Sequence, residues 1–436
     1  MERRSRVAFD SPIRATIAKP INATMKTNIT SMGHLEGERR LFTLQYRRRQ
    51  KSRSCDALGS TSAIDPTGRR LSDMAYQPLL ESYLDTLREF GGSDLHLKAN
   101  VPARVRISGR LRSIDTLPAP TPGDLTNMME TIMPKTAAST FKRAGETDFA
   151  YVDNHGRRYR VNCFVFGRGI GFAFRSVKPQ APTYADLGLP SSIANLTNIE
   201  RGLILVTGPT GSGKSSTLAA IVNAINVAKA KHIITLEDPI EFVHHDQQSF
   251  INQREIGFDT RTFASALRAS LRQDPDVILV GEMRDLETVE AAMQAAETGH
   301  LVLSTLHTLG VAETISRIID FFPPYQQNQA RVSLADILAA VISQRLVEAM
   351  PGDALVAACE ILVTNGRVKQ AILEPDRVTD LKTIVTEGAF YGMMTFDQAL
   401  AQLVTEGKIT VTTALANASN SHDLGLILKD LEHPIS

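Results

Sequence analysis

A buried strand that runs directly into a glycine-rich loop and then into a helix limits the fold of this chain more than any other feature. The strand is predicted at 202–207, the loop follows as Gly208-Pro-Thr-Gly-Ser-Gly-Lys214-Ser215, and helix-forming residues extend to about Ala230. Backbone N–H groups of such a loop turn inward around phosphate oxygens, and the helix N-terminus adds its positive end. Lys214 is placed to reach β- and γ-phosphates, and the Ser215 hydroxyl to ligate Mg²⁺. The pattern predicts a nucleoside triphosphate site.

The sequence pattern around this loop predicts an α/β protein with a second, smaller domain before it. Short apolar strands expected at 233–236, 277–280 and 301–306 alternate with helical segments, which indicates a mostly parallel sheet. We expect this core at 187–322 and a mainly helical part at 323–436. Residues 74–177 predict a small α+β domain, and 178–186, with two prolines in its first five residues, predict a linker.

The first 73 residues differ from the rest in charge. They carry 15 Lys/Arg against 7 Asp/Glu, whereas the remainder carries 33 against 40. Lacking a helical or strand period, 1–73 predict a disordered basic head. It could tether the chain to nucleic acid or an acidic membrane, or be a solvated tail, or lie upstream of a true start at Met74.

Composition excludes several other classes of protein. Three cysteines, far apart in the 436 residues, argue against a disulfide framework and a structural zinc site. No apolar run approaches the ~20 residues that would span a bilayer. The basic start is not followed by an apolar segment, so we expect no secretory signal.

Acidic residues follow two of the predicted strands. Glu282 follows the strand at 277–280, where a P-loop protein places its Mg²⁺-side carboxylate, although Gly281 stands where an Asp is usual. The metal is therefore expected to be held partly through waters. Glu237, Asp238 and Glu241 follow another strand and offer a general base, but the residues alone do not say which, and a solvated acidic loop is the alternative.

Two histidines bracket the strand at 301–306. Extended chain separates His300 from His307 by roughly 20 Å, so they cannot share a metal. One of them could sense the γ-phosphate, or each could simply be satisfied within the fold. The arginines of the small domain leave a similar choice between a solvated sheet face and contact with a neighbour's phosphate.

Taken together, these blocks resemble the secretion-superfamily ATPases, and most closely the type IV pilus retraction ATPases (the PilT/PilU-like family), over about 76–436. The resemblance is carried by Ser93-Asp-Leu-His-Leu97, Arg160-Val-Asn162, the loop 208–215, Glu237-Asp-Pro-Ile-Glu241-Phe-Val-His244, Asn252-Gln-Arg-Glu255, Asp274-Pro-Asp-Val-Ile-Leu-Val-Gly-Glu-Met-Arg-Asp285, Ala296-Glu-Thr-Gly-His300, Ser304-Thr-Leu-His307 and Val341-Ile-Ser-Gln-Arg-Leu346.

The resemblance implies a PAS-like N-terminal domain followed by a RecA-like ATPase domain with a helical C-terminal part, using ATP and Mg²⁺. It implies that Glu241 is the catalytic base and Glu282 the Walker B acid beside Ser215 at the metal. His300 and His307 fall at the family's His-box positions. The implied nucleotide contacts are Gly208, Pro209, Thr210, Gly211, Ser212, Gly213, Lys214, Ser215, Ser216, Arg160 and Arg175, the arginines in part across a subunit boundary.

The same resemblance implies a cytoplasmic homohexamer, peripheral to the inner face of the cytoplasmic membrane. Its domain movements would act on an inner-membrane pilus platform protein and retract the pilus, as in twitching motility. Whether a second pilus ATPase is a further partner stays open. Nucleic acid is not expected, since the body is acidic and poor in aromatic residues.

Two alternatives within the superfamily stay open. One is the pilus-extension or type II secretion ATPase, disfavoured because its four-cysteine insert is missing: Cys359 is the only cysteine after Cys163. The other is an accessory retraction ATPase that depends on a partner motor. Residues 367–374 only partly match a C-terminal block that retraction ATPases often carry. This departure weakens the case for coupling to retraction and leaves the case for ATP hydrolysis unchanged.

Overall fold

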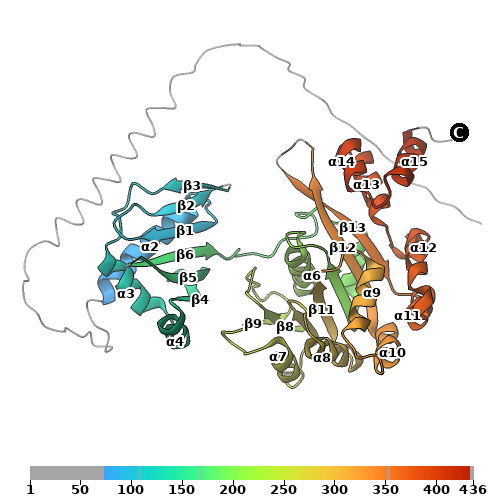
Figure 1. Ribbon diagram of the computed structural model, residues 1–436, viewed down its shortest axis with the longest axis horizontal. Coiled ribbons are helices and arrows are strands. Elements are labelled where there is room, and N and C mark those ends of the chain that lie inside the picture. Colours follow the sequence, from blue (N-terminus) through green and yellow to red (C-terminus); the bar gives the residue numbers. More distant parts are fainter. Residues whose placement is uncertain (1–72, 108, 168, 351, 353, 433–436) are drawn as a thin grey trace, which may run out of the picture. The chain divides into compact units, whose positions relative to one another are not determined.

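The computed structural model describes residues 73–107, 109–167, 169–350, 352 and 354–432 (Figure 1). The basic head predicted at 1–73 falls outside these residues apart from Asp73. Among the described helices, none is long and apolar enough to cross a membrane.

The N-terminal part is a six-stranded antiparallel sheet with helices packed on it. The strand order is β3-β2-β1-β6-β5-β4. Its elements are α2 (Asp73–Glu89), β1 (Asp94–Lys98), β2 (Arg104–Ile107), β3 (Arg110–Ser113), α3 (Pro122–Ile132), α4 (Lys135–Ala144), β4 (Glu146–Val152), β5 (Arg158–Phe166) and β6 (Gly169–Ser176).

Leu80, Tyr83, Leu84 and Leu87 lie at helical spacing on α2 and form a stripe that is fully buried against this sheet. Two hairpins, β2–β3 and β4–β5, pair neighbouring strands of this sheet. Strand β6, which the pattern did not predict, pairs with β1 and β5 and so completes the middle of the sheet.

The rest of the chain is built on a seven-stranded sheet of order β13-β12-β7-β11-β10-β8-β9. All neighbouring strands are parallel except the pair β12–β13. The elements up to the sheet's last strands are α5 (Ser191–Ala194), η1 (Asn195–Asn198), β7 (Gly202–Thr207), α6 (Lys214–Ala228), β8 (His232–Glu237), β9 (Phe250–Glu255), α7 (Phe263–Ser270), β10 (Val277–Val280), α8 (Leu286–Glu297), β11 (Leu301–Leu306), α9 (Val311–Asp320), α10 (Gln327–Ile337), β12 (Leu338–Glu348) and β13 (Leu355–Val363).

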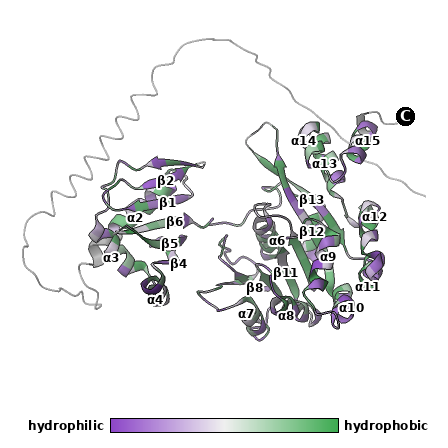
Figure 2. Ribbon diagram, in the orientation of Figure 1, coloured by the Kyte–Doolittle hydropathy of each residue, from purple (hydrophilic) through white to green (hydrophobic). Residues whose placement is uncertain are grey.

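Helices cover both faces of this sheet. Alternate residues of β7 bury on opposite sides: Leu203 and Leu205 join the apolar side chains of α7 to α10, while Ile204 and Val206 join those of α6 and α5. Figure 2 shows the sheet's strands predominantly in the hydrophobic colour. The mostly parallel sheet predicted from strand–helix alternation is confirmed, and the structure shows helices on both of its faces.

The C-terminal segment holds the expected helices but also two strands that the sequence did not predict. The helices are α11 (Gly366–Leu373), η2 (Pro375–Asp380), α12 (Leu381–Thr386), η3 (Ala389–Tyr391), α13 (Phe396–Thr405), α14 (Val411–Asn417) and α15 (Ser421–Glu432). Strands β12 and β13 belong to the central sheet, so this part of the predicted helical segment is wrong. A short buried apolar run such as 338–342 fits a helix or a strand equally well, and only its pairing with β7 decides between them.

Candidate functional site

The glycine-rich loop follows a strand that is buried along its whole length. All six residues of β7 are buried, and the loop passes from Gly208 to Gly213, which caps α6. Gly211 and Gly213 have φ of +81° and +88°, a left-handed conformation that favours glycine. The loop therefore ends at the N-terminus of a 15-residue helix, where free N–H groups and the helix dipole favour an anion.

Lys214 folds back over this loop. Its ammonium Nζ donates to the carbonyl oxygens of Gly208 at 2.8 Å and Pro209 at 2.9 Å. Burial lowers the pKa of Lys214, and the negative charge of Glu282 opposes that shift. The side chain of Lys214 thus already lies along the loop that would surround a phosphate.

Glu282 is held at the end of β10 by two cationic or potentially cationic neighbours. Its Oε2 lies 2.8 Å from Arg284 Nε and 3.6 Å from His307 Nε2, and its side chain is only 15% exposed. Gly281 has little room for a side chain, since a Cβ there would lie 3.2 Å from the Leu236 carbonyl oxygen on β8. Close packing of β10 on β8 is a physical reason for glycine at the position where an Asp was expected.

The carboxylates that follow β8 have different surroundings. Glu237 accepts hydrogen bonds from Thr235 Oγ1 at 2.6 Å and Gln253 Nε2 at 3.1 Å, and burial raises its pKa. Glu241 is exposed and lines the cavity described below. Glu237 also lines the cavity, but its carboxylate is engaged by Thr235 and Gln253, whereas Glu241 is exposed there.

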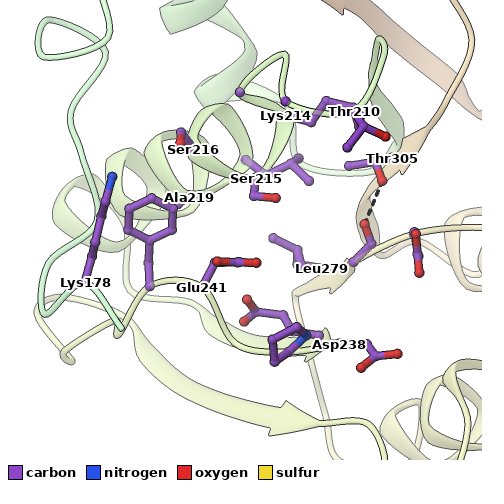
Figure 3. Close-up of a pocket in the computed structure, with 18 of the residues that line it drawn as sticks. Lys178, Thr210, Lys214, Ser215, Ser216, Ala219, Asp238, Glu241, Leu279 and Thr305 are labelled. Carbon is purple, nitrogen blue, oxygen red and sulfur yellow. Dashed lines mark hydrogen bonds between the residues drawn. The ribbon is translucent and has the colours of Figure 1, made fainter. Parts of the chain in front are cut away.

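A cavity of about 600 Å³ joins these groups. It is lined by residues 210–216 of the loop and α6, by the segment after β8, and by Glu282, Thr305 and His307. Figure 3 shows Ser215 on the first turn of α6 and Glu241 on the facing loop, with the Thr305 hydroxyl, which donates to the Gly281 carbonyl at 2.7 Å, at the side. A cavity of this size at the carboxyl ends of parallel strands suits a nucleotide.

Not all the predicted site residues meet there. His307 lines the cavity, but His300 lies at the opposite end of β11, with Nδ1 2.9 Å from the Ala295 carbonyl oxygen. Arg175 lines the cavity and donates to Asp94 at 2.8 Å, whereas Arg160 pairs with Asp148 at 3.6 Å. Within the described chain, neither His300 nor Arg160 lines the cavity, although Arg160 pairs with Arg175 across β5 and β6.

Comparison with known proteins identifies the family. The family described as "Type II/IV secretion system protein" matches residues 183–420, more than half of the chain. This chain belongs to that family.

Two relatives named as type IV pilus ATPases match this chain over nearly their whole length. The "Type IV pilus retractation ATPase PilT" of Pseudomonas aeruginosa is 43% identical over 328 residues, covering 75% of this chain and 94% of that protein. "Type IV pilus ATPase PilU" of the same organism is 37% identical over 349 residues, covering 80% and 91%. The crystal structure of "the Pilus Retraction Motor PilT and Bound ADP" superposes with a TM-score of 0.72 at 40% identity, covering 80% of this chain and 98% of that one. The resemblance to the PilT/PilU-like family is confirmed.

In this secretion-family chain the structure also places side chains to which the sequence assigned no role. His244 lines the cavity, and burial lowers its pKa to about 4. Lys178, at the start of the expected linker, lies 5.4 Å from the ring centroid of Phe242, and its carbonyl accepts the Val243 N–H at 3.1 Å. His244 belonged to a family block, but the Lys178 contact left no local pattern because it joins segments about 65 residues apart.

Proposed function

We propose that this chain is a Mg²⁺-dependent ATPase that powers type IV pilus retraction. The observation that carries the proposal is its 43% identity to a retraction ATPase across 94% of that protein, which spans both the phosphate-binding loop and the acidic segments. The structure of a related retraction motor contains ADP, and the cavity beside the loop offers the volume and the donors for that class of ligand.

The residues around the cavity fit a nucleotide with its metal. The N–H groups of the loop and Lys214 are suited to the phosphates, together with Gly208 to Ser216 along the loop and first helical turn. Ser215 and Glu282 supply oxygen ligands of the kind that Mg²⁺ takes. When bound, Mg²⁺ would neutralise charge on the phosphates.

Glu241 is our candidate for the general base. It is exposed to the cavity, while Glu237 is engaged by Thr235 and Gln253. In this proposal its carboxylate orients the attacking water and accepts its proton. His307, 3.6 Å from Glu282, is placed to report on the charge near the metal ligand.

The assembly we propose is a homohexamer at the inner face of the cytoplasmic membrane, acting on a pilus platform protein. Arg175 would contact nucleotide in its own chain. Arg160 and His300, which do not line the cavity of the single chain, would take part from a neighbouring subunit. A second candidate is an accessory retraction ATPase, favoured by the 37% identity to PilU over 80% of this chain.

Two measurements test the proposal. The first is Mg²⁺-dependent ATP turnover per subunit against protein concentration, with Lys214→Ala as control. A rise with concentration that the control lacks supports a ring with shared sites, while no turnover at any concentration argues for the accessory role.

The second measurement is pilus retraction in the source bacterium after deletion of the gene. We expect retraction to be lost, and to be restored by the unchanged chain but not by Lys214→Ala. Normal retraction after deletion would contradict the proposed function.

A further inference from the structure

A buried glutamine from a distant strand joins the two halves of the phosphate-binding motif. Gln344 is only 3% exposed. Its amide Nε2 donates to the Ser212 carbonyl oxygen in the loop at 2.7 Å. Its Oε1 accepts the hydroxyl of Thr217, a fully buried residue on the first turn of α6, also at 2.7 Å. Both ends of one side chain are therefore used, one on the loop and one on the helix that follows.

The loop also rests on Gln344 by close van der Waals contact. A Cβ placed on Gly208 would lie 2.3 Å from the Gln344 carbonyl oxygen, and one on Gly213 would lie 2.9 Å from Nε2. These are the first and last glycines of the loop. Glycine at both positions lets the loop close around Gln344.

The register of β12 accounts for this position. The parallel pairing of β12 with β7 ends at Ser343 and Thr207, whose hydroxyls are 2.8 Å apart. Gln344 is the next residue and so lies where β7 turns into the loop. Arg345 follows it and contacts the C-terminal helices instead, 4.0 Å from the ring centroid of Phe396.

We propose that Gln344 is a positioning residue that orients the phosphate-binding loop, an inference that rests on the proposed nucleotide site. A trans peptide points its C=O and the following N–H in opposite directions. Anchoring the Ser212 carbonyl on Gln344 therefore turns the Gly213 N–H away from Gln344. The Thr217 bond ties the same amide to the first turn of α6, so loop and helix N-terminus keep one relative orientation in the absence of ligand.

The test compares variants in the full chain. Gln344→Met keeps the length of the side chain but loses both hydrogen bonds. Gln344→Glu keeps the acceptor for Thr217 and, when ionised, loses the donor to Ser212. Arg345→Met is the matched control, because it removes polar contacts from the adjacent residue of β12 without touching the loop. For each, affinity for MgADP is titrated with a fluorescent ADP analogue, and the thermal midpoint is measured without nucleotide.

We expect Gln344→Met to weaken ADP binding about tenfold or more, the scale of a lost hydrogen bond that leaves a buried partner unpaired. Gln344→Glu is assayed at alkaline pH, where its buried carboxyl ionises, because the neutral acid can still donate to Ser212. There we expect the same loss. Arg345→Met should bind within about twofold of the unchanged chain even where its thermal midpoint falls. If Gln344→Met does not fold, Gln344→Glu alone decides the question.

Two results would overturn the inference. One is ADP affinity within about twofold of the parent in the folded Gln344 variants. The other is an equal loss of affinity in Arg345→Met, which would show a general effect of weakening β12. If the unchanged chain fails to bind ADP, the proposed function itself is wrong, and the inference falls with it.

Discussion

Replacing Glu241 with glutamine separates the general base from the residues that bind nucleotide. The change keeps the size and hydrogen-bonding reach of the side chain but removes its ability to accept a proton. Glu241 is exposed at the wall of the cavity, so the substitution has little effect on packing. Lys214, Ser215 and the loop, which carry the binding groups, are unchanged.

The expected magnitude follows from this geometry. A lost general base costs roughly 10²-fold or more in turnover, which corresponds to about 2.7 kcal/mol of activation free energy. Because a surface substitution at an exposed site changes stability by only about 0.5 kcal/mol, the thermal midpoint should hardly move. ADP affinity should stay within about twofold, since binding in the ground state does not need the base.

The assay measures steady-state ATP turnover at saturating Mg²⁺ and ATP. Two variants in the same segment serve as comparisons. Asp238→Asn, also exposed, should retain near-normal turnover. Glu237→Gln alters a buried carboxylate bonded to Thr235 and Gln253, and should lower the free energy of unfolding by about 1–3 kcal/mol. Turnover of Glu241→Gln within about threefold of normal would refute the assignment and move the base to Glu237 or Glu282.

Further outcomes follow from the same structure. Gly208→Ala should lower the free energy of unfolding by more than about 3 kcal/mol, because its Cβ would meet a backbone carbonyl at 2.3 Å, whereas Gly211→Ala, with open space around it, should cost only about 1–2 kcal/mol; equal losses in denaturant titrations would contradict this. His244 has its pKa lowered to about 4 by burial, so the unfolded chain binds more protons between pH 4 and 6.5, and stability should fall as pH drops through that window. His244→Gln should flatten that part of the profile, and an unchanged slope would show that other groups dominate. Removal of Mg²⁺ with EDTA should abolish turnover, and Lys214→Ala should abolish both turnover and ADP binding, measured by titration; retained binding would place the phosphates elsewhere.

The local elements of this fold were predictable because their signals lie within short stretches. The run 202–207 is apolar throughout and leads into the loop, so β7, the loop and α6 were expected where the structure has them. The stripe on α2 repeats at helical spacing, and acids directly after strands mark the carboxyl edge of a parallel sheet. These features depend on neighbouring residues.

Which side chains meet was decided by tertiary pairing. Three carboxylates lie at the end of β8 and just after it, and all three line the cavity; only the folded chain shows that Glu237 is bonded to Thr235 and Gln253 while Glu241 is exposed. His300 and His307 matched one family pattern, yet the strand between them puts them at opposite ends, and only His307 lines the cavity.

The sequence by itself determined the class of protein and the chemistry of its phosphate-binding loop, since a glycine-rich loop between a buried strand and a helix leaves few folds open. Only the tertiary structure decided that β12 lies beside β7 and that Gln344 supports Ser212, 132 positions away. The physical reason is that strand order and register arise from burial of both faces of the sheet at once, a property of the whole packed domain and of no single segment.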